Sequence, residues 1–198
     1  MKKFAVVLSG CGVYDGSEIH EAVLTLLAIQ NNEAEYQCFA PDIEQYHVVN
    51  HLNGAVMNEK RNVLIESARI SRGEIKPLSE FNAENFDAII LPGGFGVAKN
   101  LSTYAFEGAN CSVLPELKKI ILEMHSLHKP IGAMCISPVI IANVIEKSTV
   151  TIGVDDGTAK DIESMGSIHL KTTYGEVIAD KRNMIFTTPC YMLDSNLV

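Results

Sequence analysis

Excess positive charge, long apolar runs and closely spaced cysteine pairs are all missing from this sequence of 198 residues. Its 24 aspartates and glutamates outnumber its 16 lysines and arginines, which gives a formal net charge of −8. A phosphate backbone or an anionic membrane surface repels such a chain, so we expect neither nucleic acid nor membrane as a partner. No apolar run approaches the roughly 18 residues that a membrane-spanning helix needs.

The five cysteines are scattered and form no C-x-x-C pair, which argues against a disulfide framework and against a structural zinc site. They are Cys11, Cys38, Cys111, Cys135 and Cys190. Unpaired thiols indicate a reducing compartment. The apolar segment Phe4–Leu8 that follows Met1-Lys2-Lys3 is too short for the core of a secretion signal. We therefore expect a cytoplasmic protein, with an organelle matrix as the alternative setting.

Short apolar runs alternate with amphipathic segments along the chain. Runs of strand length occupy Phe4–Leu8, Tyr36–Ala40, Phe86–Leu91, Pro130–Met134 and Thr149–Ile152. Helical spacing of apolar residues marks Ser17–Asn31, Asn58–Ser71, Val113–Leu127 and Ile136–Ile145. This alternation predicts one doubly wound α/β domain over residues 1–198, with a mostly parallel sheet covered by helices on both faces. Near the C-terminus, Glu176–Ala179 and Met184–Thr188 flank a polar turn and predict a small β-hairpin.

Three glycine-rich or strained turns follow strands of this predicted sheet, at Ser9–Gly16, Pro92–Gly96 and Cys135–Pro138. Ligands bind open parallel sheets at the carboxyl ends of the strands, so we expect the functional site where these turns meet. The first turn also resembles a dinucleotide-binding fingerprint. Asp15 and Glu18 would repel a pyrophosphate there, so a tight turn followed by a well-capped helix is the favoured interpretation.

Cys135 is the strongest candidate for chemistry, because it lies between a buried strand and a helix whose first turn contains Pro138. A side chain at such a corner meets the N–H groups of the helix start. These groups lower the pKa of a thiol and can hold an oxyanion, so we expect the Cys135 pKa to lie below the usual value of about 8.5. The alternative is a buried cysteine with a structural role only.

The histidines give no indication of a metal site or of another cofactor. His125 and His128 lie three residues apart without an acidic or cysteine ligand at a suitable spacing, so we expect no metal there. His20 lies two residues after Glu18, and residues two apart on a helix do not face each other. We therefore expect His20 to point away from Glu18.

Four stretches together resemble the ThiJ/PfpI superfamily, which is related to the class I glutamine amidotransferases. They are Leu8–Glu21, Pro92–Leu101, Met134–Pro138 and Thr187–Leu193. Within that superfamily the sequence is most similar to the enhancing lycopene biosynthesis branch, the isoprenoid biosynthesis glyoxalases. The matches span nearly the whole chain, and the first two are long enough to be highly specific.

This resemblance implies a flavodoxin-like fold with Cys135 as the catalytic nucleophile and Glu18 as the carboxyl group that holds the thiol. It further implies that the substrate-binding residues are Gly10, Gly93, Gly94, Asn100 and Ile136. The implied function is a lyase-type glyoxalase of low turnover that needs no glutathione and no cofactor. Such an enzyme converts a small dicarbonyl, glyoxal, to glycolate through a hemithioacetal on Cys135, and the resemblance links this activity to protein deglycation.

Two positions depart from the superfamily pattern. Ile136 stands where many members have a histidine directly after the nucleophile, and His169 is followed by Leu170-Lys171 instead of completing a His-x-Glu pair. Glutamine hydrolysis is therefore not expected, and aldehyde chemistry should be slow. The alternatives are a redox or stress sensor that responds through oxidation of Cys135, and a non-catalytic binding protein associated with isoprenoid biosynthesis.

The last residues, Tyr191–Val198, resemble the beginning of a closing helix that relatives continue. We expect that without this helix an apolar patch near Met184–Leu193 is covered by a second copy of the chain. The sequence therefore predicts a homodimer.

Overall fold

The computed structural model describes residues 1–193. In this part of the chain, seven strands form a sheet in the order β3-β2-β1-β4-β5-β9-β8, and a separate pair joins β6 to β7. The strands of the sheet are β1 Lys3–Val7, β2 Glu35–Ala40, β3 Ile75–Pro77, β4 Ala88–Leu91, β5 Ile131–Met134, β8 Ile178–Asp180 and β9 Ile185–Thr188. Neighbouring strands of this sheet are parallel except β8 and β9, which are antiparallel. The predicted mostly parallel, flavodoxin-like α/β fold with its C-terminal hairpin is confirmed.

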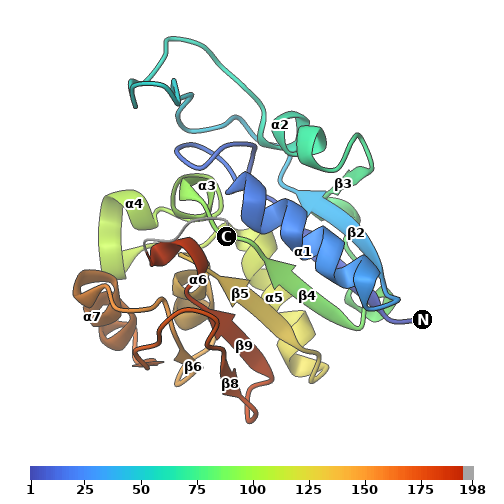
Figure 1. Cartoon of the computed structure of the whole chain (residues 1–198), viewed down its shortest axis with the longest axis vertical. Helices are drawn as coiled ribbons and strands as arrows, with labels where there is room; N and C mark the ends of the chain where they lie inside the picture. The colour runs from blue at the N-terminus through green and yellow to red at the C-terminus, as the bar shows by residue number, and fades with distance from the viewer. Residues whose placement is uncertain (194–198) are drawn as a thin grey trace.

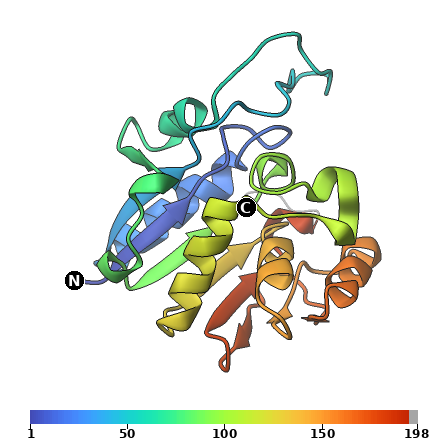
Figure 2. The same ribbon diagram turned by 180° about the vertical axis from the view of Figure 1, so that it is seen from behind.

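Helices cover both faces of the sheet, with α1 in front of it in Figure 1 and α5 in front of it in the reverse view of Figure 2. The helices are α1 Ile19–Asn31, α2 Val63–Ile70, α3 Phe95–Lys99, α4 Tyr104–Glu107, α5 Pro115–Ser126, α6 Pro138–Val144 and α7 Asp156–Ser164. Short 3₁₀ turns occur at Leu78–Glu80, Ala83–Asn85, Gly108–Asn110 and Cys190–Met192.

Strand β1 and the residue that follows it supply apolar side chains to two separate cores. Ala5 and Val7 belong to the larger core, which α5 and α6 complete. Val6 and Leu8 belong to the smaller core, which α1 and α2 complete. Because successive strand residues point to opposite faces, a strand buried on both faces must be apolar at every position. This is why the apolar runs in the sequence predict the parallel sheet so well.

The start of α1 differs from the predicted helix Ser17–Asn31. Glu18 is the N-cap residue with an extended backbone, and its carboxylate accepts a hydrogen bond from the Glu21 N–H at 2.7 Å. Ser17 is not available as a cap, because its hydroxyl accepts the N–H of Ser9 at 2.8 Å. The helix therefore begins two residues later than predicted, and this shift decides which acidic side chain points into the site.

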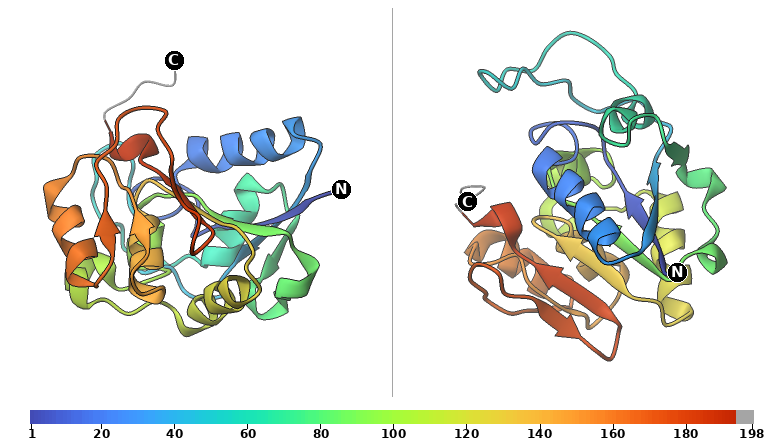
Figure 3. Two further views of the ribbon diagram at one scale, coloured as in Figure 1. Left: turned by 90° about the horizontal axis from the view of Figure 1, so that it is seen from below. Right: turned by 45° about the vertical axis from the view of Figure 1, so that its right-hand side comes forward.

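An arm formed by residues 42–62 leaves the body between β2 and α2 (Figure 1; Figure 3, right). Its middle section, residues 51–60, is exposed. The arm returns at Asn62, the N-cap of α2, so the first part of the predicted helix Asn58–Ser71 is not helical.

Small elements in the second half of the chain were not fully predicted. The expected strand Thr149–Ile152 contributes only β6, Thr149–Val150, which pairs with β7, Ile168–His169, outside the main sheet. The part of the expected closing helix that the structure describes is a 3₁₀ turn at Cys190–Met192, which ends at Leu193 with an extended backbone, and residues 194–198 lie outside the described residues. No helix within residues 1–193 is long and apolar enough to cross a membrane.

Candidate active site

The three predicted turns meet at the carboxyl edge of β1, β4 and β5, which are neighbours in the sheet. The Glu18 N–H donates to the Gly93 carbonyl at 2.9 Å, and the Gly96 N–H donates to the Gly16 carbonyl at 2.8 Å. The Ser137 hydroxyl donates to the Pro92 carbonyl at 2.7 Å. The three turns are therefore connected by hydrogen bonds, because they follow strands that lie side by side in the sheet.

Cys135 occupies the corner between β5 and α6. Its φ of 57° lies in the left-handed region, which non-glycine residues rarely adopt. The Cys135 N–H donates to the Thr188 carbonyl at 3.1 Å, so the end of β9 helps to hold the corner in place. The residue is 7% exposed. This backbone geometry is that of a nucleophile elbow, although the thiol is largely covered.

Glu21, rather than Glu18, is the carboxyl group that contacts the Cys135 thiol, through a side-chain hydrogen bond. The Glu21 carboxyl is fixed by the Gly93 N–H, which donates to Oε2 at 2.8 Å, and by the Tyr191 N–H, which donates to Oε1 at 3.2 Å. Glu21 is 4% exposed. The structure thus brings together residues from α1, the turn after β4, the corner after β5 and the segment after β9.

The contact predicted for Glu18 is therefore corrected. Glu18 caps α1 through Oε2, and its Oε1 lies 3.1 Å from Nδ1 of His20. The expectation that His20 points away from Glu18 is also wrong, because it assumed that both residues are helical. Glu18 lies outside the helix, so the spacing rule for helical neighbours does not apply to this pair.

Glu21 was present in the matched stretch, but its role was missed. In the predicted helix Ser17–Asn31, the spacing of three residues would place the carboxyls of Glu18 and Glu21 on one side, so the sequence pattern does not separate them. Only the position of the cap determines which of them turns inward, and serine, the residue type at position 17, caps helices as well as acidic residues do. The choice of Glu18 as the cap depends on the Ser9 N–H, which donates to the Ser17 hydroxyl and leaves it unable to cap the helix.

Gly93 permits the close approach of the nucleophile and the carboxyl group. A Cβ atom at residue 93 would lie 2.8 Å from the Cys135 sulfur and 2.8 Å from Oε2 of Glu21. Both distances are shorter than normal contacts, so a side chain at this position would displace one partner. The second glycine, Gly94, has a φ of 102° and places its N–H on the Cys135 sulfur, as does Ile136. The N–H groups of Gly94 and Ile136, both expected to bind substrate, thus lie at the Cys135 sulfur, whereas the Gly93 N–H donates to Glu21.

Cys135 and Glu21, which form the acid pair of the site, both hold their protons more tightly than usual. Burial raises the pKa of Glu21 to about 7, although the N–H groups of Tyr191 and Gly93 act in the opposite direction. Burial also raises the pKa of Cys135, the Glu21 carboxylate adds to this rise, and the N–H groups of Gly94 and Ile136 oppose it. The expected lowering of the Cys135 pKa is therefore wrong, because burial beside a carboxylate outweighs the helix N–H groups.

Gly10 and Asn100, predicted to bind substrate, instead hold the first turn together. Gly10 has a φ of 114° and its N–H donates to the Ser67 hydroxyl at 2.9 Å. The Asn100 amide donates to the carbonyls of Ser9 and Asp15, both at 2.9 Å, and its oxygen accepts the Tyr46 N–H at 3.0 Å. Gly10 thus joins the first turn to α2, and Asn100 joins it to the arm.

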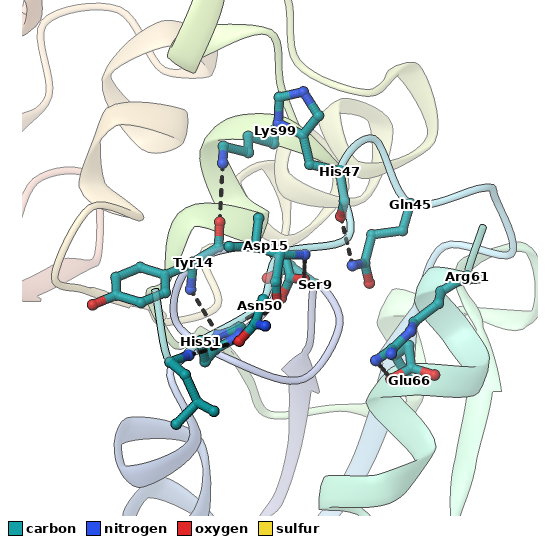
Figure 4. Close-up of polar contacts among 12 residues, drawn as sticks. Ser9, Tyr14, Asp15, Gln45, His47, Asn50, His51, Arg61, Glu66 and Lys99 are labelled. Atoms are coloured by element: carbon teal, nitrogen blue, oxygen red, sulfur yellow. Dashed lines mark hydrogen bonds and ion pairs between the residues drawn. The ribbon is translucent and has the colours of Figure 1, made fainter. Parts of the chain in front are cut away.

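Figure 4 shows how the arm is anchored on this first turn. The buried Asp15 carboxylate accepts the Val49 N–H at 2.6 Å. Nε2 of His51 accepts the Tyr14 N–H at 3.2 Å, and Nζ of Lys99 donates to the Tyr14 carbonyl at 2.9 Å. Asp15, which argued against a pyrophosphate in the sequence, therefore serves as the central acceptor of the anchor.

A mainly apolar groove of about 440 Å³ opens beside Glu21. Its lining includes Leu24, Thr25, Met134, Cys190 and Tyr191. Burial and the Glu21 carboxylate raise the pKa of the Cys190 thiol to about 12. The groove reaches Glu21 from the surface between α1 and the segment after β9. Within residues 1–193, no three or more His, Cys, Asp or Glu side chains are grouped so that they could hold a metal ion.

Comparisons with known proteins agree with this geometry. No family model matches the sequence. A rat protein named ES1 protein homolog, mitochondrial, and a human protein named glutamine amidotransferase-like class 1 domain-containing protein 3, mitochondrial, are each 45% identical to this chain. These alignments cover 98% of this chain and 77% and 76% of the rat and human proteins.

Solved structures give the same result for the fold. An isoprenoid biosynthesis protein with an amidotransferase-like domain from Ehrlichia chaffeensis is 40% identical and has a TM-score of 0.91, over 98% of this chain and 91% of its own. DJ-1beta from Drosophila melanogaster, at 14% identity and a TM-score of 0.57 over 96% of this chain and 84% of its own, shares the fold.

The cytoplasmic expectation is corrected by these relatives. The rat and human proteins, and an ES1 protein of zebrafish, are all named as mitochondrial. Unpaired cysteines indicate only that the compartment is reducing, and they do not distinguish the cytoplasm from an organelle matrix.

Proposed function

The chain belongs to the family of the ES1 and glutamine amidotransferase-like class 1 proteins, and from this premise we propose that it is a cysteine-dependent glyoxalase. In this proposal the enzyme converts glyoxal to glycolate without glutathione and with low turnover, and protein-bound dicarbonyl adducts are a related substrate. The observation that carries the proposal is the buried hydrogen bond between Cys135 and Glu21, with the N–H groups of Gly94 and Ile136 on the sulfur.

The first step is the addition of the Cys135 sulfur to one carbonyl carbon of glyoxal. The thiol proton passes to Glu21 as the carbon–sulfur bond forms, and the carbonyl oxygen becomes an oxyanion that receives a proton to give a hemithioacetal. The N–H groups of Gly94 and Ile136 are placed to stabilise that oxyanion. A carboxyl group with a pKa of about 7 can accept and return a proton near neutral pH, which suits Glu21 to this role.

The second step moves a proton from the carbon that carries the sulfur to the neighbouring carbon. The first carbon is thereby oxidised to a thioester, and the second carbon is reduced to an alcohol. Water then cleaves the thioester, which releases glycolate and restores the Cys135 thiol. The overall reaction adds one water to glyoxal and needs no external oxidant or reductant. The proposed reaction therefore runs without a redox cofactor.

Glutamine hydrolysis is not proposed, despite the relatives' name. Ile136 follows the nucleophile, and the ring of His169 lies in β7, where its Nε2 accepts the Ile152 N–H at 3.3 Å. With that nitrogen occupied by the backbone, His169 is a poor candidate for a general base.

The proposal also includes a link with isoprenoid biosynthesis. It is supported by the similarity to the isoprenoid biosynthesis protein from Ehrlichia chaffeensis.

Glycolate formation from glyoxal by the purified protein tests the proposal. We expect turnover by the wild type and none above background by Cys135→Ser. Cys111→Ser is the matched control, because Cys111 is also buried but its sulfur contacts Asn143 instead of Glu21. Equal turnover by wild type and Cys135→Ser would reject the proposal, and no turnover by the wild type would favour a binding role.

A second candidate, redox sensing, is favoured by the surroundings of the Cys135 sulfur. When a hydroperoxide oxidises this thiol, the N–H groups of Gly94 and Ile136 and a protonated Glu21 could stabilise the resulting sulfinate. Mass analysis after mild peroxide treatment should then place two added oxygen atoms on Cys135. Oxidation spread evenly over the five cysteines would contradict this candidate.

A further inference from the structure

The proposed reaction needs a proton-transfer group besides Glu21. One proton must move between two carbons, and a water molecule must be activated to cleave the thioester. Glu21 is 4% exposed and is already bonded to the Cys135 thiol and to two N–H groups. Ile136 occupies the position after the nucleophile and can do neither task. The site therefore needs another side chain that reaches solvent and is held close to the acid pair.

His20 lies in the first turn of α1, directly before Glu21. Its Nδ1 lies 3.1 Å from Oε1 of Glu18. A carboxylate oxygen can only accept a hydrogen bond, so in the tautomer that places the hydrogen on Nδ1, facing Glu18, Nε2 is left free to act as a base. An imidazole oriented by a carboxylate in this way is the arrangement found where histidine serves as a general base.

Glu18 is itself fixed on the site, so it can orient His20 accurately. Its Oε2 accepts the Glu21 N–H at 2.7 Å, and its own N–H donates to the Gly93 carbonyl at 2.9 Å. Gly93 in turn donates to the Glu21 carboxyl at 2.8 Å. The 3.1 Å contact of His20 with Glu18 thus leads into a set of hydrogen bonds that reaches the residues around the nucleophile. The Glu18 side chain is only 10% exposed, so its carboxylate lies largely out of water.

The His20 ring lies near Tyr191, a residue that donates to Glu21. Its centroid is 6.0 Å from that of the Tyr191 ring, and the Tyr191 N–H is one of the donors to Glu21. The His20 side chain is 52% exposed, so it can exchange protons with water. Three other histidines have partners away from this site. His51 accepts the Tyr14 N–H, and His169 accepts the Ile152 N–H. His125 contacts the side chain of Asn183.

We infer that His20 is the proton-transfer residue of this site and that Glu18 is its positioning residue. This inference rests on the proposed glyoxalase function. Nε2 of His20 accepts the proton from the carbon that carries the sulfur and returns it to the neighbouring carbon. The electron pair of the broken C–H bond passes into an enediolate. The thioester forms when the second carbon receives this proton and the hydroxyl proton of the first carbon passes to the oxygen of the second carbon, which becomes the alcohol. His20 thus takes the place of the histidine that is absent at position 136.

Glyoxal turnover by His20→Gln tests the inference, with Cys135→Ser beside it and His128→Gln as the matched control in the loop after α5. Glycolate and the borohydride-trapped adduct on Cys135 are both measured. We expect kcat of His20→Gln to fall about 100-fold with little change in KM, because removal of a general base costs at least that factor. The Cys135 adduct should still form, and imidazole added to the buffer should restore part of the rate. Glu18→Gln should give a smaller loss of about tenfold, because it removes only the orienting group.

Turnover of His20→Gln within threefold of wild type, beside an inactive Cys135→Ser, would overturn the role of His20 and leave the proposed function intact. Equal loss of adduct and turnover in His20→Gln would also overturn it, since that result indicates a structural role. Absence of both adduct and glycolate in the wild type would overturn the proposed function and this inference together. Thermal unfolding of each variant shows whether it is folded.

Discussion

At the scale of single residues, the site depends on one buried carboxyl group that serves several partners. Glu21 contacts the Cys135 thiol and receives N–H groups from Gly93 and Tyr191. These donors favour the ionised carboxylate, but burial acts more strongly and raises its pKa to about 7. The proton of this pair is therefore available near neutral pH, where a proposed proton acceptor is most useful.

Removal of the Glu21 charge should make Cys135 a stronger acid. The Glu21 carboxylate raises the pKa of the Cys135 thiol, so in Glu21→Gln more thiolate is present at a given pH. We expect iodoacetamide to label Cys135 faster in the variant than in the wild type at pH 8, as measured by mass spectrometry of peptides. Slower or equal labelling would show that the charge of Glu21 does not raise the pKa of the Cys135 thiol. Turnover should fall in the same variant by about 100-fold, because the thiol loses its proton acceptor.

The raised pKa of Glu21 also makes a contribution to stability that depends on pH. Below pH 4.5, the ordinary value, the carboxyl is protonated in both the folded and the unfolded protein and contributes no difference. As the pH rises from there to about 7, the unfolded chain ionises first, so this group lowers the free energy of unfolding. The full effect is about 3 kcal/mol. Urea unfolding at pH 5 and pH 8 should show a larger decrease for the wild type than for Glu21→Gln, and parallel decreases would contradict the assignment.

At the scale of secondary-structure elements, short turns decide where the functional groups lie. The turn after β4 brings Gly93 against both Cys135 and Glu21, and the turn before α1 decides that Glu18 caps while Glu21 points inward. The sequence placed Cys135 correctly at a strand–helix corner, because that prediction needed only local pattern. It misassigned the carboxyl partner, because the cap of α1 depends on a hydrogen bond from Ser9, eight residues away from Ser17.

A single methyl group on Gly93 should disturb the site. In Gly93→Ala the added Cβ would lie 2.8 Å from both the Cys135 sulfur and Oε2 of Glu21, so the pair must separate. We expect turnover to fall at least tenfold and the free energy of unfolding to decrease by about 1–3 kcal/mol, which is typical of overpacking. Gly157→Ala in α7 is the matched control, because its Cβ meets nothing closer than 3.4 Å and alanine favours a helix. Normal activity in Gly93→Ala would refute the steric role.

At the scale of the whole molecule, the sheet is the part that the sequence predicted best. Strands buried on both faces are apolar at every position, and this pattern is visible without any knowledge of contacts. The arm of residues 42–62 was not predicted, because its anchor joins Asp15 to Val49 and His51 to Tyr14 across more than thirty positions of sequence. Such pairings leave no periodic pattern along the chain.

The predicted homodimer belongs to this scale and stays a prediction. Apolar side chains on the outer side of α1 are exposed, among them Val23, Leu24 and Leu27, and Phe186 on β9 is 37% exposed. Exposed apolar surface of this kind favours association. Light scattering at tens of micromolar protein should give twice the mass of the chain. A mass equal to that of one chain would contradict the prediction and would show that this surface is tolerated in water.

The bond between the Tyr191 N–H and Glu21 joins residues 170 positions apart. A ribosome adds about 5–20 residues per second, so roughly ten to thirty seconds separate the synthesis of these two residues. During that interval α1 and the first strands can fold, but Glu21 lacks one of its two backbone donors. Cys135 likewise lacks the Thr188 carbonyl that holds its backbone. A nascent chain therefore carries no finished thiol–carboxyl pair until Thr188 and Tyr191 have been synthesised and have reached the site.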